Sequence, residues 1–256
     1  MLKNLKFKLR RAARRTLWPR PALFFPIGVV KNRGNVFRSD YDLYICGYPR
    51  SGNTFALKAF ELANPGFSIR SHKHIPTFVI QSVKWNLPGM VLIRKPLDSA
   101  ISWSIFTREP IAESLSYYMD FYSMLAPYRE SLFFVSFEDV TTDFGQVIQS
   151  FNNRWNTQYH TFDNTPENVL HCMEEIESEY RDTNGQVIEH KVPRPSSQRK
   201  LEKKALQDQV NRSSALQKQL HQAEQLYRLL APQKFSPKPV SNKTSGTQMI
   251  RMQTAR

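Results

Sequence analysis

The sequence predicts an α/β fold with three layers, in which helices cover both faces of a mainly parallel central sheet. Short apolar runs typical of buried strands alternate along the chain with longer segments of helical periodicity. Strands that are separated by helices pair in parallel through right-handed crossovers. The chain has 256 residues, which is enough for one such domain with short tails.

The elements of this fold follow from the pattern in chain order. Four short apolar segments are expected to be strands, at residues 42–47, 67–71, 90–94 and 132–137. Helices are expected between and after them, at about 54–63, 76–87, 97–106, 112–126 and 141–154, with Thr141 and Thr142 as capping residues of the last. A broken apolar stripe also predicts a mainly helical segment at 197–231.

The basic residues are concentrated at the two ends of the chain. The net charge is +14, yet residues 1–20 hold eight Lys or Arg and residues 232–256 hold five, with no acid in either segment. Removing these thirteen of the thirty-six bases leaves twenty-three against twenty-two acids. A protein that binds nucleic acid along its folded surface needs the basic excess there, so this class of function is disfavoured.

Three regions are therefore expected: a basic segment at 1–20, a domain at 36–231 and a basic tail at 232–256. The first has leucines at helical spacing between bases, which leaves two interpretations open: a helix on an anionic membrane surface, or a solvated tail. It is too charged to span a bilayer and lacks the apolar core of a signal peptide. The tail, rich in Pro, Ser, Thr and Lys, is expected to be disordered.

Two cysteines, Cys46 and Cys172, do not make a disulfide framework. Cys46 lies within the first apolar run, where a buried and inert thiol is expected. This cysteine content favours a reducing compartment such as the cytoplasm.

The segment GYPRSGNT at 47–54 follows the first strand and resembles a nucleotide-binding P-loop, G-x-x-x-x-G-K-[ST]. A strand that turns through glycine into a helix presents backbone amides to an anion, and phosphate is the usual guest. Ser51 and Thr54 add hydroxyl groups, and Arg50 adds a cation. Asn53, however, stands where the P-loop has its lysine.

The missing lysine argues against MgATP as the guest. The third strand also ends in Arg94, where a Mg²⁺ site would need a carboxylate, although Glu138 and Asp139 after the fourth strand leave a kinase as an alternative. A site that has cations and no clear carboxylate suits a group-transfer reaction that needs no metal ion.

The loop after the first strand and the segment after the third strand resemble motifs of the sulfotransferases that use 3′-phosphoadenosine 5′-phosphosulfate (PAPS). The family's 5′-phosphosulfate loop reads Y-P-[KR]-[ST]-G-[TSN]-[ST]-[WF], and this chain has YPRSGNTF from Tyr48 to Phe55. Its 3′-phosphate signature, R-x-P-x-D-x-x-x-S, is matched by RKPLDSAIS from Arg94 to Ser102. The resemblance covers about residues 40–155, is closest to small bacterial sulfotransferases, and implies a P-loop NTPase-like fold. It implies PAPS as sulfuryl donor, no metal, and cofactor binding by Arg50, Ser51, Gly52, Asn53, Thr54, Phe55, Arg94 and Ser102.

The family commonly places a histidine in a short H-x-P context between the two motifs, as the base that deprotonates a hydroxyl acceptor. In SHKHIP at 71–76, His74 matches that position, and His72 is the second candidate. A histidine of near-neutral pKa can take the acceptor proton. The other histidines show no ligand spacing with this pair, so zinc is not expected.

The resemblance gives Arg50 the role of stabilising the charge on the departing oxygen, where many members have lysine. The family's R-K-G-x-x-G-D-W pattern is absent, but the basic segment HKVPRPSSQRK at 190–200 stands at its place. Arg194 and Arg199 there are candidates for the 3′-phosphate, and a solvated helix start is the equal alternative.

The acceptor stays open between carbohydrate, lipid and small molecule, and the oligomeric state is not specified. The rival functions are the kinase and a non-catalytic adaptor held at a membrane through residues 1–20. An aromatic stripe between Trp103 and Tyr122 could enclose the acceptor, but its helical spacing favours a place in the core.

Overall fold

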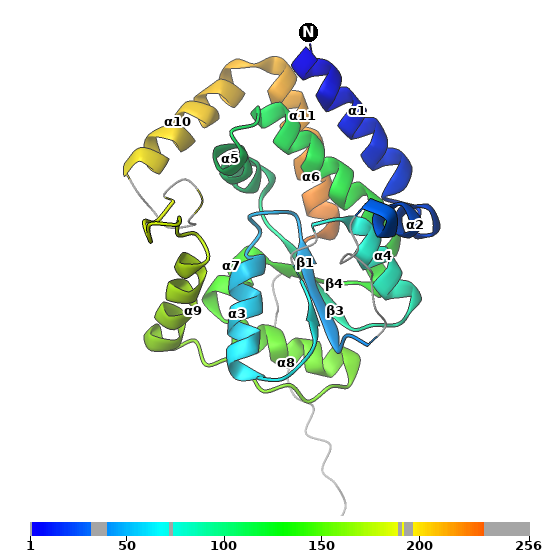
Figure 1. Cartoon of the computed structure of the whole chain (residues 1–256), viewed down its shortest axis with the longest axis vertical. Helices are drawn as coiled ribbons and strands as arrows, with labels where there is room; N and C mark the ends of the chain where they lie inside the picture. Colours follow the sequence, from blue (N-terminus) through cyan, green and yellow to red (C-terminus); the bar gives the residue numbers. More distant parts are fainter. Residues whose placement is uncertain (1, 32–39, 72–73, 189–190, 192–196, 233–256) are drawn as a thin grey trace, which may run out of the picture.

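A computed structural model of the chain describes residues 2–31, 40–71, 74–188, 191 and 197–232. Four parallel strands form one sheet in the order β2-β1-β3-β4, with helices on both faces (Figure 1). This confirms the three-layer α/β prediction. All but the first residue of the tail expected at 232–256 lies outside the described residues.

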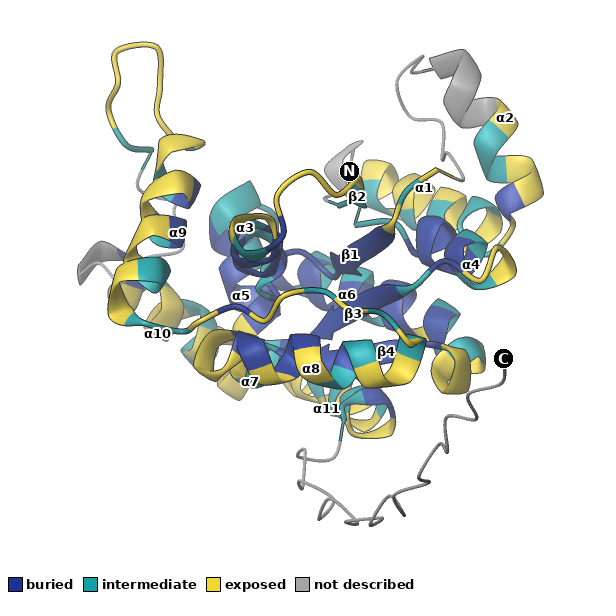
Figure 2. Ribbon diagram, turned by 90° about the horizontal axis from the view of Figure 1, so that it is seen from below, coloured by how far each residue is buried: buried dark blue, intermediate teal, exposed yellow. Residues whose placement is uncertain are grey.

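The two central strands are β1 (Leu43–Gly47) and β3 (Gly89–Ile93), and every residue in both is buried. The edges are β2 (Ile69–Arg70) and β4 (Phe133–Ser136). Parallel strands covered on both faces read as continuous apolar runs, which is why the sequence located them well. Figure 2 shows β1 and β3 as buried ribbons between helices whose outer sides are exposed.

Each face of the sheet has its own apolar core. One is built with α4 (Pro76–Lys84), α5 (Pro96–Thr107), α6 (Ile111–Leu125) and α11 (Ser214–Leu230). The other is built with α3 (Asn53–Ala63), α7 (Phe137–Thr142), α8 (Phe144–Trp155) and α9 (Pro166–Ser178). Cys46 is buried in the first core, and burial raises the pKa of its thiol to about 12, as expected for an inert cysteine.

Tyrosines on α6 tie together the ends of the central strands. The hydroxyl of Tyr122 accepts from the backbone N–H of Tyr48 at 3.2 Å and donates to the carbonyl of Leu92 at 2.6 Å. Tyr118 donates to the carbonyl of Arg94 at 2.9 Å. Both side chains are fully buried, so this part of the aromatic stripe is core, as its spacing indicated. The polar ends of these rings fix the backbone where β1 and β3 end.

The structure departs from the predicted elements after β4. Thr141 and Thr142 do not cap a helix; instead Ser136 caps α7 and Asp143 caps α8, each accepting a backbone N–H three residues later. A short 3₁₀ segment, η1 (Ala126–Ser131), precedes β4. The segment expected to be helical at 197–231 is two helices, α10 (Ser197–Arg212) and α11, because Ser213 caps the second.

The N-terminal residues form α1 (Leu2–Leu17) and α2 (Pro21–Lys31), and both helices pack on the domain. The side chains of Arg14 and Arg15 pair with Asp120 of α6 at 3.1 and 2.9 Å. Phe24 and Phe25 of α2 make edge contacts with Phe78 of α4. The described part of the basic segment is thus an ordered layer over α6 and α4. Among the described residues, no helix is long and apolar enough to cross a bilayer.

Candidate active site

The loop between β1 and α3 has an unusual backbone. Arg50 has a φ of 67° and Gly52 a φ of 89°, both in the left-handed region. A Cβ on Gly52 would meet the ring of Phe137 at 3.2 Å, so conformation and space both require glycine. Left-handed residues near a helix start turn successive N–H groups toward one point, which makes a concavity for an anion. A non-glycine residue at positive φ stores strain of the kind that collects at functional sites.

Asn53 helps to close this loop. Its Nδ2 donates to the carbonyl of Tyr48 at 2.9 Å, which ties the first turn of α3 to the end of β1. The Oδ1 of Asn53 is buried without a hydrogen-bond partner. The buried hydroxyl of Ser51 lies beside that of Tyr122, where hydrogen bonding opposes the rise that burial causes in the pKa of this phenol. Buried polar atoms are usually paired, so the unpartnered Oδ1 of Asn53 fits a site that a donor group of a ligand completes.

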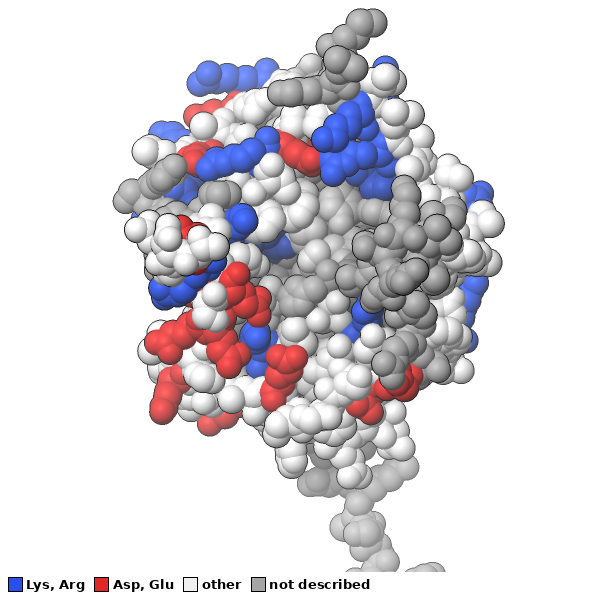
Figure 3. All heavy atoms as spheres, in the orientation of Figure 1, with Lys and Arg blue, Asp and Glu red and all other residues white. Residues whose placement is uncertain are grey.

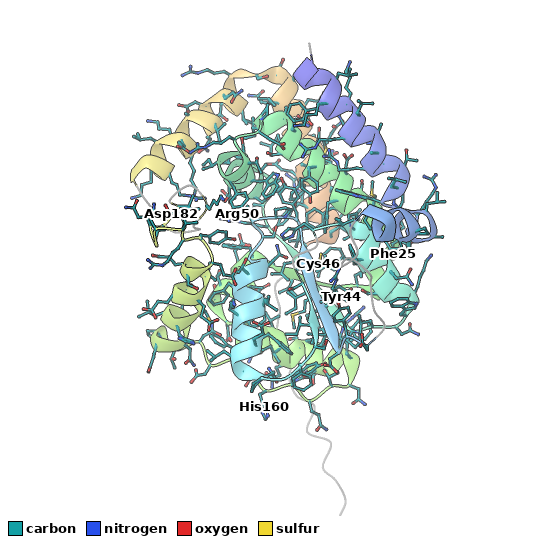
Figure 4. All side chains as sticks on the ribbon, viewed as in Figure 1. Phe25, Tyr44, Cys46, Arg50, His160 and Asp182 are labelled. Carbon is teal, nitrogen blue, oxygen red and sulfur yellow. The ribbon has the colours of Figure 1, made fainter. Side chains whose placement is uncertain are left out.

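The hydroxyl of Ser102 is the meeting point of two arginines. Arg50 donates to it from Nε at 3.1 Å and Arg199 donates from Nη2 at 3.3 Å. Arg50 also donates from Nη1 to the carbonyl of Lys191 at 3.2 Å, while its Nη2 is buried without a hydrogen-bond partner. Ser102 and Arg199 are themselves buried, at 5% and 6% exposure. Arg50 stands beyond the N-terminal end of α3 in Figure 4.

A third arginine belongs to the same cluster. Arg94, at the end of β3, donates from Nη1 to the backbone carbonyl of Arg50 at 3.1 Å. Its guanidinium lies over the ring of Phe137 at 3.9 Å, and that of Arg50 lies over Phe106 at 5.3 Å. Aromatic faces stabilise cations at sites that exclude water. Arg50 and Arg94 are 44 residues apart in the sequence, and the two motifs therefore meet through these arginines and Ser102.

The pKa values of the basic residues in this cluster are lowered by burial, and several also by one another's charge. Burial, and then the charges of Arg199 and Arg94, lower the pKa of Arg50 to about 10. Burial also lowers the pKa of Arg94, and Asp98 and Glu138 oppose that shift. Burial and the neighbouring Arg94 and Arg199 lower the pKa of Lys203 on α10. Like charges held together in a partly buried cluster cost free energy, and a bound anion would recover that cost.

His74 lies at the entrance to the loop. Its Nδ1 is 2.8 Å from the carbonyl oxygen of Gly47, and its own carbonyl accepts from the hydroxyl of Tyr117 at 2.6 Å. A carbonyl oxygen can only accept, so Nδ1 carries the proton and, in the neutral ring, Nε2 is the basic nitrogen. The contacts therefore fix the tautomer that a general base requires.

The structure brings most of the sequence-predicted site residues together, with one outlier. The side chain of Phe55 packs in the core beside Phe162, so only its backbone N–H in the first turn of α3 is suited to contact an anion. Thr54 is half-buried in the same turn. His72 and Arg194 lie outside the described residues.

Sequence reasoning missed three contributors to this site. Lys203 is one turn from Arg199 on α10, and the spacing of four residues could have shown that both share a face. Tyr180, after α9, contacts Phe106 at 6.3 Å between ring centroids and raises the pKa of Arg50. The carbonyl of Lys191 is a backbone contact with no sequence signal. Tyr180 and Lys191 come close to the loop only through the tertiary fold.

The carboxylates on which the kinase alternative depends have structural partners. Asp139 accepts from the hydroxyl of Ser136 at 2.6 Å, in the capping turn of α7. Glu138 is half exposed and lies 3.8 Å from the ammonium group of Lys95. Among the described residues, no group of three or more His, Cys, Asp or Glu side chains is placed to hold a metal ion.

Comparisons with known proteins identify no family. No family model matches the chain, and no curated protein matches it. Among solved structures, mouse sulfotransferase SULT7A1 complexed with PAP shares 15% identity, with a TM-score of 0.39, over 73% of this chain and 90% of that one.

Proposed function

We propose that the protein is a sulfotransferase that moves a sulfuryl group from PAPS to a hydroxyl acceptor. The observation that carries the proposal is the convergence of three arginines on one loop and one serine hydroxyl. Arg50, Arg94 and Arg199 are each within 3.3 Å of a partner in this cluster. A ligand with two separate anionic groups matches such a cluster better than a single phosphate does.

The loop residues suit the 5′-phosphosulfate. The first backbone N–H groups of α3 have no acceptor within the helix, and the positive helix end adds to their attraction for an anion. Arg50 brings a guanidinium whose Nη2 is buried and unpartnered. The buried hydroxyl of Ser51 offers a further donor in the same turn. These groups would hold and orient the phosphosulfate.

The second set of groups suits the 3′-phosphate. Arg94 and Ser102 come from the end of β3 and from α5, and Arg199 and Lys203 come from one face of α10. Arginine donates two parallel hydrogen bonds to a phosphate, and the serine hydroxyl adds a third donor. The Arg50–Ser102 and Arg199–Ser102 bonds would be exchanged for bonds to the ligand.

Two side chains would take part in the transfer step. When bound, PAPS supplies an activated sulfuryl group for attack by the acceptor oxygen. His74 would accept the acceptor's proton at Nε2, because its Nδ1–H is held by Gly47. Arg50 would stabilise the negative charge on the oxygen of the leaving phosphate, since its guanidinium is charged at neutral pH and needs no proton transfer. Aromatic side chains around the arginines would exclude water from this charge.

Calorimetric titration with adenosine 3′,5′-bisphosphate tests the binding part. Arg94→Ala should weaken binding by about 10- to 100-fold, since a charge-assisted hydrogen bond contributes about 1.5–3 kcal/mol. Arg108→Ala is the matched control, because Arg108 is exposed just beyond the C-terminal end of α5, the helix that follows Arg94, and pairs with Glu202. Wild-type protein that fails to bind the nucleotide, or equal weakening in both variants, would reject the proposal.

The same titration distinguishes the proposed sulfotransferase from the kinase alternative. A kinase requires Mg²⁺ for nucleotide binding and gains nothing from a 3′-phosphate. Tighter binding of MgATP than of the bisphosphate would favour the kinase. Transfer of labelled sulfate from PAPS to carbohydrate, lipid and phenol pools would then identify the acceptor class.

A further inference from the structure

Helix α1 has one face that is fixed to the domain. Arg14 and Arg15 pair with the carboxylate of Asp120, which is 2% exposed. The guanidinium of Arg14 also lies over the ring of Tyr117 at 5.2 Å, and Trp18, just after the helix, contacts the same ring at 5.5 Å. The hydroxyl of Thr77 donates to the carbonyl of Trp18 at 2.6 Å. These contacts fix how α1 is rotated about its own axis.

The opposite face of α1 carries exposed leucines. Leu5 is 54% exposed and Leu9 is 62% exposed. Leu5, Leu9, Ala12 and Thr16 follow one another at spacings of three and four residues, so they form one stripe on the helix. At 3.6 residues per turn, this stripe lies roughly half a turn away from Arg14 and Trp18. It therefore faces away from the domain.

Basic residues lie along both sides of the leucine stripe. Lys6 is on one side of it and Lys8 on the other, and both are exposed. Arg10 is also exposed but pairs with Glu109. No Asp or Glu occurs in residues 1–20. Figure 3 shows Lys and Arg gathered over α1, while Asp and Glu gather over the region of α9 and α3.

We propose that this face of α1 lies on an anionic lipid bilayer. An apolar stripe between two rows of cations matches the layering of a bilayer surface, where hydrocarbon lies just beneath phosphate. The leucines would enter the headgroup boundary, and Lys6 and Lys8 would contact lipid phosphates. Because α1 is already folded and held by Asp120, binding would not have to order the helix first. This inference does not depend on the proposed enzymatic function.

Flotation of the full chain with vesicles tests the proposal. The chain should float with vesicles of phosphatidylcholine and phosphatidylglycerol, but much less with phosphatidylcholine alone, and added salt should weaken binding. Leu5→Gln with Leu9→Gln should reduce partitioning at least roughly tenfold, because two large apolar side chains lose their burial in lipid. Leu170→Gln with Leu201→Gln is the matched control, since these leucines are 59% and 71% exposed on other helices.

A second pair of variants tests the charges. Lys6→Gln with Lys8→Gln should lower binding to the anionic vesicles severalfold, and Lys84→Gln with Lys204→Gln, exposed on α4 and α10, should not. Leu5→Ala with Leu9→Ala should reduce binding in the same way. Because alanine is a strong helix former, this variant excludes unfolding of α1 as the cause of the loss. The proposal is overturned if wild-type protein does not float with anionic vesicles, or if the α1 variants and their controls behave alike.

Discussion

The guanidinium groups of Arg50 and Arg199 both donate to one hydroxyl, the Oγ of Ser102, at 3.1 and 3.3 Å. Two cations would not normally share a small neutral acceptor in a buried place, because their repulsion is poorly screened there. The contact joins the loop after β1 to α10, which are far apart in the sequence. In the proposed function, an anion bound at this serine would bridge the two arginines.

Replacing Ser102 with alanine should weaken binding of adenosine 3′,5′-bisphosphate by about 5- to 20-fold, because one hydroxyl donor to the ligand is lost. The nucleotide's stabilising effect on thermal unfolding should shrink in parallel. Ser99→Ala on the same helix is the control, since that hydroxyl is buried and bonds only to carbonyls of its own first turn. An equal effect of both changes would show that Ser102 only supports the helix.

The buried charge of Arg50 should lower the free energy of unfolding of the ligand-free protein at neutral pH. Its folded-state pKa of about 10 is below the ordinary value of arginine. The cost of burying the charge is therefore fully present below pH 10, and it disappears as the folded chain loses that proton above this pH. Arg50→Met should raise the free energy of unfolding at pH 7 by on the order of 1–2 kcal/mol.

Arg50→Met should also reduce the stabilisation of the protein by anions. Sulfate should raise the melting temperature of the wild type more than chloride does at equal ionic strength, and Arg50→Met should lose much of that difference. Arg129→Met, at an exposed arginine paired with Glu130, provides the control. If Arg50→Met is less stable than the wild type in chloride, the charge cluster is not under the strain described.

His74→Asn should abolish most of the transfer activity while leaving nucleotide binding intact. The asparagine amide can still donate to the carbonyl of Gly47, but it has no basic nitrogen in place of Nε2. Loss of a general base costs about 10²- to 10⁴-fold in kcat. His171→Asn, on the exposed surface of α9, serves as control. Activity that survives His74→Asn would move the base elsewhere, with His72 as the next candidate.

The strands, the loop and the two arginine motifs could be predicted from the sequence because local patterns determine them. A buried parallel strand is a continuous apolar run, and an anion loop needs glycine at a positive φ, as at Gly52. Lys203 could have been found from its four-residue spacing to Arg199 on α10. Tyr180 could not be located in this way, because the segment after α9 reaches the site only through long-range packing. The caps at Ser136 and Asp143 were missed because several polar residues there compete for that role.

Tyr117→Phe should reduce kcat severalfold without changing nucleotide affinity. The hydroxyl of Tyr117 donates to the carbonyl of His74, while its ring packs against Tyr48 and α1 and would stay in place. Under the proposed function, Tyr117 would thus position His74, the proposed base. Combining Tyr117→Phe with His74→Asn should cause no loss beyond that of His74→Asn alone. Additive effects, or an equal effect of the control change Tyr128→Phe in η1, would contradict this role.

Asp120→Asn should detach α1 from the domain. The change removes the negative charge that both Arg14 and Arg15 contact, and Arg14 is only 16% exposed. Breaking a buried pair costs about 3–5 kcal/mol, and the exposure of Arg15 reduces this to about 2–3 kcal/mol of unfolding free energy here. Hydrogen exchange in residues 2–17 should become faster than in the wild type, while exchange in β1 and β3 should change little. Glu130→Gln, which removes an exposed carboxylate paired with Arg129, should change neither quantity. If the exchange of α1 is unaltered in Asp120→Asn, the aromatic contacts of Trp18 and Tyr117 hold the helix without the ion pair.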